Sequence, residues 1–184
     1  MVYAYATSFV GEILTPYIVY FNNLQDHVQQ GRFLGLLLKY SLMLTLPLLV
    51  WIAFQGDHII GLMASINYAQ SGIVLKCLMP IPFLMLIYDY FNKQLYLARR
   101  SLQCSLVVLL GCCINVGLNV AGLARFGLLW AVLSTIIAYS AMIAMAGYWS
   151  DLAAWRLVWS ELRLSIIYTA GASALYATMF FLYT

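Results

Sequence analysis

Apolar stretches of about twenty residues, separated by more polar segments, dominate the pattern of this chain. At a rise of about 1.5 Å per residue, a helix of that length crosses the roughly 30 Å hydrocarbon core of a bilayer. The pattern predicts an all-α fold, a polytopic membrane helix bundle with about six transmembrane helices in a single domain over residues 1–184. The expected spans are 1–21, 33–54, 73–91, 102–123, 127–148 and 164–183.

The composition points to the same class of protein. Hydrophobic residues make up 65% of the chain and charged residues only 8%, whereas roughly a quarter of the residues in a soluble domain are charged. Aromatic residues reach 15%, which suits rings that anchor at bilayer interfaces. The net charge of +3 is too small to indicate a nucleic-acid partner. We therefore expect membrane lipid, and no nucleic acid, among the partners.

The segments between the spans set the expected orientation. Segments 22–32 and 92–101 are expected to be loops, 55–72 to hold a short interfacial helix, and 149–163 to form an amphipathic helix in the membrane interface. Lys and Arg concentrate after the first, third and fifth spans, which predicts that those segments are cytoplasmic and that the N-terminus lies outside. The residues concerned are Arg32, Lys93, Arg99, Arg100, Arg156 and Arg163.

The start of the chain carries no sign of a signal peptide. No basic residue precedes the first apolar stretch, and Glu12 and Pro16 interrupt it. An outside N-terminus without a signal is expected of a chain cut from a longer one.

No catalytic motif is visible in the sequence. There is no Gly-rich phosphate loop, no H-E-x-x-H motif and no Ser/His/Asp arrangement. None of the four cysteines forms a C-x-x-C pair, and the two histidines have no metal-ligand spacing. We expect neither an enzyme nor a cofactor or metal site, so any transport would be driven by an ion gradient or by the gradient of the substrate.

Two charged residues lie inside expected spans. Glu12 and Lys39 are each roughly 9–14 Å deep by the helical rise, where an unpaired charge costs several kcal/mol. One interpretation places both in a polar cavity, with Lys39 contacting an anionic phosphate. The other interpretation is a structural ion pair, or a Lys39 side chain that extends to the interface.

Two asparagines and two arginines offer further candidate sites. Asn115 and Asn119 are four residues apart, so both amides share one helix face. Hydrogen bonding between helices is the favoured role, and lining a cavity that contacts sugar hydroxyls is the alternative. Arg99 and Arg100 act as topology determinants in one interpretation and attract lipid phosphates in the other.

Prolines interrupt two of the expected spans. Pro47 lies at the middle of the second span, and Pro80 and Pro82 lie in the third. Each removes a backbone donor and permits a kink that a transporter can use for gating. Proline is also commoner in membrane helices than in soluble ones, so these residues do not by themselves establish gating.

A series of short motifs runs from the basic pair into the fifth span. They are Arg99-Arg100, Ile114-Asn115-Val116-Gly117-Leu118-Asn119, Arg125-Phe126-Gly127 and Leu129-Trp130-Ala131-Val132-Leu133-Ser134. This region resembles the polysaccharide (O-antigen type) flippases of the multidrug/oligosaccharidyl-lipid/polysaccharide exporter superfamily. The family usually shows Gly-Ala-Ala near residues 129–131, where this chain has Leu-Trp-Ala and so departs from it.

The resemblance implies a fold and a function. Residues 1–150 would correspond to the C-terminal lobe of a two-lobed protein, with the helix around Leu46-Pro47-Leu48 among its matches and a second lobe or subunit as partner. Such a protein would flip a lipid-pyrophosphate-linked glycan across the bacterial inner membrane by alternating access, without nucleotide hydrolysis. The implied cavity residues are Lys39, Glu12, Asn115, Asn119, Arg99 and Arg100.

Two alternatives remain open from the sequence. One is a membrane scaffold that binds polysaccharide-assembly enzymes without transporting anything. The other is a small-molecule or drug exporter of the same superfamily. A cationic cavity would favour the flippase over the drug exporter, but the basic residues Lys39 and Lys76 match the acidic Glu12 and Asp89 in number. Only the resemblance favours the flippase.

Overall fold

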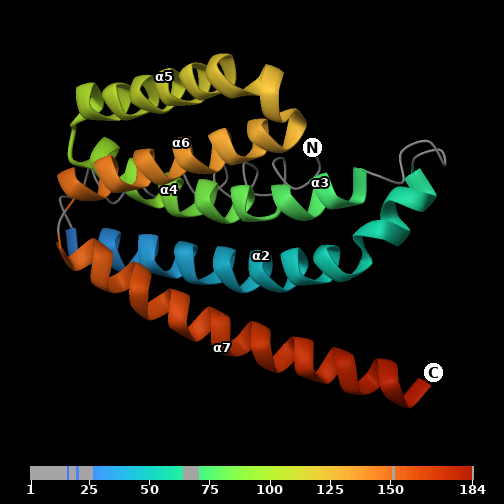
Figure 1. The fold of residues 1–184 in the computed structure, drawn as a ribbon. Coiled ribbons are helices and arrows are strands. Elements are labelled where there is room, and N and C mark those ends of the chain that lie inside the picture. The colour runs from blue at the N-terminus through green and yellow to red at the C-terminus, as the bar shows by residue number, and fades with distance from the viewer. Residues whose placement is uncertain (1–15, 17–19, 21–26, 64–70, 151, 184) are drawn as a thin grey trace.

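The computed structural model describes residues 16, 20, 27–63, 71–150 and 152–183, and within them the chain is all-α. This confirms the expected fold class. Figure 1 shows the helices running side by side. Their bounds are α2 His27–Met63, α3 Ser71–Leu78, α4 Pro80–Leu97, α5 Ser101–Phe126, α6 Leu128–Trp149 and α7 Leu152–Tyr183.

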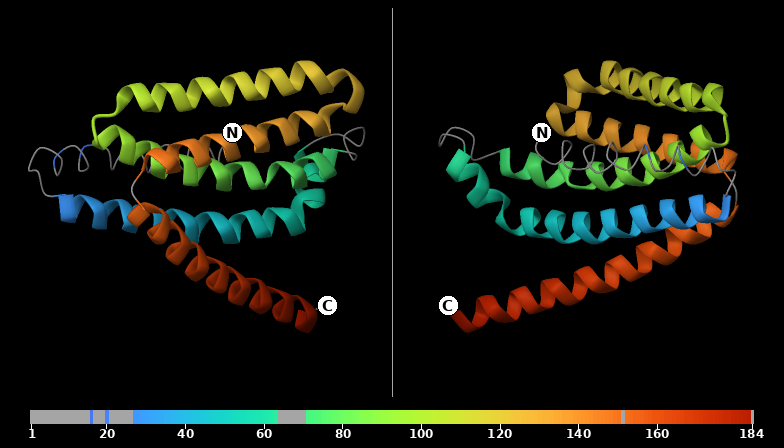
Figure 2. Two further views of the ribbon diagram at one scale, coloured as in Figure 1. Left: turned by 60° about the vertical axis from the view of Figure 1, so that its left-hand side comes forward. Right: turned by 180° about the vertical axis from the view of Figure 1, so that it is seen from behind.

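The helices form a row in the order α5, α6, α4, α2 and α7. The close contacts are between α5 and α6, α6 and α4, α4 and α2, and α2 and α7, while α3 lies against α2 and α6. The same order is visible in the other two views (Figure 2). Helices α5 and α7 therefore stand at the two edges of the row, and α6, α4 and α2 occupy its interior.

Three stretches among the described residues are long and apolar enough to cross a membrane. They are Phe33–Ile52 within α2, Ser101–Phe126 and Leu128–Trp149. These stretches correspond to the second, fourth and fifth expected spans, and they identify the chain as a membrane protein. The first expected span, 1–21, lies outside the described residues apart from Pro16 and Tyr20.

The second span is part of a longer helix than the sequence predicts. Helix α2 begins at His27 and continues to Met63, so the loop expected for residues 22–32 is wrong for 27–32. Residues 55–63 likewise continue α2 instead of forming a separate interfacial helix, while 64–70 lie outside the described part. Hydropathy marks where a helix leaves hydrocarbon, and a helix satisfies its own backbone hydrogen bonds on either side of that boundary.

The third expected span is interrupted at Met79, which separates α3 from α4. Pro80 takes the first position of α4 and Pro82 lies in the same turn. A proline at the start of a helix costs no hydrogen bond, because the first N–H groups have no intrahelical partner. Pro80 and Pro82 therefore begin a helix, whereas Pro47 lies in the interior of one.

The expected basic loop 92–101 is also wrong for most of its length. Helix α4 continues to Leu97, and a tight turn leads directly to Ser101. The N–H of Arg100 donates to the carbonyl of Leu95, and the N–H of Arg99 donates to that of Tyr96, both at 3.0 Å. This is a Schellman turn in which Arg99, at φ +58°, holds the left-handed position where glycine is usual.

The segment 149–163 does not form a separate helix on the membrane surface. From Leu152 it is the first part of the continuous helix α7. Its apolar side packs into the protein instead, since Val158 is only 3% exposed and the Trp155 ring contacts the Phe91 ring with centroids 4.7 Å apart. Trp159, on the other side, is exposed. The apolar residues in this segment therefore recur at helical spacing because they are buried against α2 and α4, and not because they face lipid.

We expect the left-handed turn at Arg99 to be a source of strain. A side chain in this conformation costs about 1 kcal/mol relative to glycine. Arg99→Gly should therefore raise the free energy of unfolding in detergent by about 0.5–1 kcal/mol. Ala98→Gly is the matched control, because Ala98 has φ −72° and should gain nothing. Equal effects of the two substitutions on unfolding would show that the turn is unstrained.

Candidate functional site

The asparagines of the α5–α6 hairpin form a ladder of hydrogen bonds between the two helices. The Asn115 side-chain amide donates to Thr135 Oγ1 at 3.1 Å, and that of Asn119 donates to Asn115 Oδ1 at 2.9 Å. Ser134 Oγ lies 3.0 Å from Asn119 Oδ1 and 2.9 Å from the carbonyl oxygen of Ala131. The amides thus bond across the hairpin, which is the favoured interpretation of the sequence.

Glycines allow the two helices of the hairpin to approach closely. At Gly122 a Cβ atom would collide with the Trp130 indole, and at Gly111 with the Met142 side chain. The Trp130 indole N–H donates to the carbonyl of Leu118 at 2.7 Å. In an apolar environment an unbonded indole N–H or amide is costly. The hairpin is therefore built so that its polar groups find partners within it.

Gly127 turns the chain between α5 and α6. It adopts φ +69° and ψ −158°, a backbone conformation that is essentially restricted to glycine. Its N–H donates to the carbonyl of Leu123 at 3.0 Å, and its own carbonyl accepts from the N–H of Trp130 at 3.1 Å. The break that the sequence predicts between the fourth and fifth spans therefore has a specific geometry, and Trp130 follows it directly.

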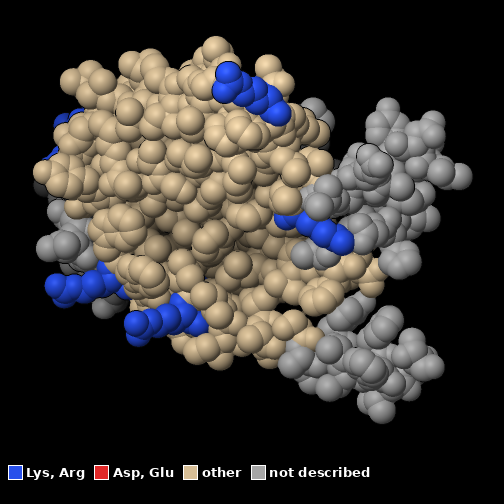
Figure 3. All heavy atoms as spheres, in the orientation of Figure 1, with Lys and Arg blue, Asp and Glu red and all other residues tan. Residues whose placement is uncertain are grey.

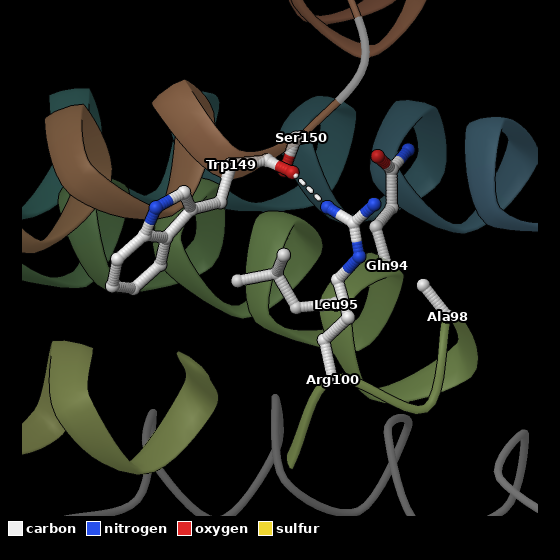
Figure 4. Close-up of a pocket in the computed structure, with 6 residues that line it drawn as sticks. All are labelled: Gln94, Leu95, Ala98, Arg100, Trp149 and Ser150. Atoms are coloured by element: carbon white, nitrogen blue, oxygen red, sulfur yellow. Dashed lines mark hydrogen bonds between the residues drawn. The ribbon is translucent and has the colours of Figure 1, made fainter. Parts of the chain in front are cut away.

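A second polar feature is a cavity of about 70 Å³ at the opposite end of this hairpin. Arg100 extends from the turn between α4 and α5, and its Nη1 donates to the carbonyl oxygen of Trp149 at 2.8 Å (Figure 4). A cation is favourable at the carbonyl end of a helix, here α6. The residues that line the cavity are Gln94, Leu95, Ala98, Arg100, Trp149 and Ser150.

Several helix ends meet around this cavity. Helices α4 and α6 end there and α5 and α7 begin there (Figure 1). Basic residues therefore collect at one end of the row, because Lys93, Arg99, Arg100 and Arg156 all lie on these helix ends, whereas Arg125 is at the other end of α5. One face of the molecule shows Lys and Arg near its margins and a broad uncharged surface between them (Figure 3).

The remaining candidate residues lie apart from these two features. Lys39 is half-buried on α2. It lies one turn after Gly35, and a Cβ atom at Gly35 would face Leu157 of α7, so Lys39 is on the side of α2 near α7. Helices α4 and α6 separate α2 from α5 in the row, so Lys39 is not beside the asparagine ladder. Glu12 lies outside the described residues. Helix α2 remains helical across Pro47.

Sequence reasoning missed the tryptophans that hold the helices together. Trp155 lies over Gly147 as Trp130 lies over Gly122, and its indole N–H donates to the Gly147 carbonyl at 3.0 Å. In both cases the glycine lies before a turn, and the tryptophan lies after the turn, eight residues beyond the glycine. That repeated spacing is the signal that the sequence offered. Gln94 was missed because it was assigned to a loop.

Comparison of the chain with family models, curated proteins and solved structures found no match.

We expect the close approach at Gly122 to be essential for the hairpin. In Gly122→Ala the new methyl group would displace the Trp130 indole and break its hydrogen bond, which should lower the free energy of unfolding by about 1–3 kcal/mol. Gly117→Ala is the matched control on the same helix, because a Cβ there meets nothing within 4 Å. The free energy of unfolding in detergent would be measured for both variants, with tryptophan fluorescence as the signal. A Gly122→Ala protein as stable as Gly117→Ala would exclude this packing.

The asparagine ladder can be tested with a double-mutant cycle. Asn119→Ala and Ser134→Ala should show a coupling energy of about 0.6 kcal/mol, the average for hydrogen bonds between membrane helices. The control cycle pairs Asn119→Ala with Ser140→Ala, since the Ser140 hydroxyl is exposed and bonds to its own helix at Ile136. Coupling in the control that equals coupling in the ladder would contradict a direct bond.

Proposed function

We propose that the chain is part of a flippase that moves a lipid-linked oligosaccharide across the bacterial inner membrane by alternating access, without nucleotide hydrolysis. The observation that carries the proposal is the α5–α6 hairpin. The residues that resemble the polysaccharide flippases are those of the asparagine ladder, the Gly127 turn and Trp130 with its contacts. The motif thus corresponds to a defined piece of structure.

In the proposal the glycan does not pass through the Arg100 cavity. That cavity offers about 70 Å³, where one water needs about 10–15 Å³ by the same measure. In the proposal, a second lobe or subunit completes the transport pathway. The lipid tails stay in the bilayer, and polar side chains replace the hydration that sugar and phosphate lose on entering hydrocarbon.

Lys39 is the proposed contact for the pyrophosphate group. Lys39 is half-buried as a residue and lies on a helix with a membrane-length apolar stretch, and a charge within a span marks a substrate path or a polar partner. Because Gly35, one turn earlier, faces Leu157 of α7, we propose that the pathway runs along that side of α2. The asparagine ladder then serves to hold the hairpin together, and the glycan contacts come from elsewhere.

A complementation experiment tests this function. Cells that lack their O-antigen flippase would receive the chain alone or with a matching N-terminal lobe, and surface glycan would be measured. We expect rescue only with the added lobe. Lys39→Ala should abolish rescue at equal expression, because the phosphate loses its cation, while Lys39→Arg should retain most of it.

Arg125→Ala is the control for a general effect of charge, because Arg125 lies at the far end of the hairpin. If Lys39→Ala rescues as well as the unchanged chain, Lys39 is not in the pathway. If correctly inserted protein never rescues, with or without the lobe, the flippase proposal fails and the scaffold alternative is favoured. Export of dyes without glycan would favour the small-molecule exporter.

A further inference from the structure

The guanidinium of Arg100 has more hydrogen-bond donors than its contacts with the described residues use. Of its five N–H groups, one donates to the carbonyl of Trp149. Figure 4 shows the guanidinium between Trp149 and Gln94, at the cavity that these residues line. The Gln94 amide uses one hydrogen on Tyr90 Oη at 2.7 Å and has a second. Two residues therefore present donors at one small cavity.

The cavity has the chemistry of an anion site. Among the described residues that line it there is no Asp or Glu, and Arg100 supplies a full positive charge. The Ser150 hydroxyl donates to the carbonyl of Ala146 at 2.8 Å, so it is not an additional donor. A planar guanidinium with adjacent donors matches the oxygens of a phosphate group.

The volume restricts the anion to a small group. About 70 Å³ is roughly five times the space that one water needs by the same measure. A single phosphate, with one phosphorus and four oxygens, is of that size. The cavity is half open, so the rest of a larger molecule can lie outside it while the phosphate occupies it.

The depth of the cavity indicates where the phosphate comes from. The membrane-length stretches of α5 and α6 begin at Ser101 and end at Trp149, so the cavity lies where two spans leave hydrocarbon. Trp149 lines it, and the neighbouring Tyr148 is 84% exposed, as expected of rings at the headgroup level. Lys93 and Arg156 on the adjoining helix ends add positive charge near an anionic membrane surface.

We propose that the cavity around Arg100 binds the phosphate of an anionic membrane phospholipid. The phosphate accepts from Arg100 at the turn after α4 and from Gln94 on α4, while Arg100 keeps its bond to Trp149 at the end of α6. This site is independent of the transport proposal, since it needs neither a glycan nor a second lobe.

The test measures lipid binding to the purified full chain in an uncharged detergent. Phosphatidylglycerol, diacylglycerol and inorganic phosphate would each be titrated, and bound molecules counted by native mass spectrometry. We expect phosphatidylglycerol to bind and diacylglycerol, which lacks the phosphate, not to bind. Arg100→Gln should bind phosphatidylglycerol about tenfold more weakly, as expected for the loss of one charge-assisted hydrogen bond. Arg100→Lys should retain most of the affinity.

Two further variants separate the cavity from general charge and from misfolding. Arg156→Gln removes an exposed charge at the same end without touching the cavity, and should bind within twofold of the unchanged chain. Ala98→Leu fills the cavity while keeping every charge, and should weaken binding as Arg100→Gln does. It also keeps the bond from Arg100 to Trp149, so it tests the site even if Arg100→Gln does not fold.

Each outcome decides for or against the site. Loss in Arg100→Gln and Ala98→Leu, with binding retained in Arg156→Gln, supports it. Inorganic phosphate bound with the same dependence on Arg100 supports the phosphate chemistry and makes soluble phosphate the source. Equal loss in Arg156→Gln and Arg100→Gln overturns the proposal in favour of diffuse attraction, as does unchanged binding in Ala98→Leu. None of these results depends on whether the chain supports flipping.

Discussion

The contact on which the rest of this structure depends is a tryptophan seated on a glycine of the preceding helix. Between membrane helices there is little hydrophobic driving force, so association relies on close packing and on hydrogen bonds. Gly122 and Gly147 expose helix backbone, and Trp130 and Trp155 cover it while their N–H groups donate to carbonyls there. Each contact satisfies an indole donor and joins consecutive helices, first α5 to α6 and then α6 to α7.

The second of these contacts organises the core at the basic end of the row. Trp155 stacks at a tilt on Phe91, which is fully buried, and α2 closes the same cluster through Leu38 and Leu42. A single aromatic centre therefore joins α2, α4, α6 and α7. Helix α5 reaches this core chiefly through Val107, so most of its packing is with α6. The asparagine ladder lies in that pairing.

How much of this the sequence predicts depends on whether a feature is local. The two apolar helices expected as spans four and five follow from hydropathy, and the structure has them as α5 and α6, long and apolar enough to cross a membrane. The expected gap at 124–126 is wrong, because α5 continues to Phe126 and the chain turns at Gly127. The ends of α2, α4 and α7 do not follow, because hydropathy records the hydrocarbon boundary while the helices continue past it through residues such as Gln94 and Trp155. The cavity at Arg100 could not be predicted from the sequence for the same reason. It forms because α4 extends to Leu97 and the chain turns tightly at Arg99.

The two polar features differ in how much of their hydrogen-bonding capacity is already used. In the ladder, Asn115 and Asn119 bond to each other and to Ser134 and Thr135, so a ligand there would have to displace bonds that hold the hairpin. At the helix ends, Arg100 makes one bond within the part of the chain that the structure describes, to Trp149, and so keeps four of its five donors there. Breaking the ladder costs stability, whereas filling the cavity leaves every existing bond in place. Among the described helices, the asparagines that suggested a sugar site from sequence already bond within the hairpin, so of these two features the one at the basic end can take a ligand without breaking a bond.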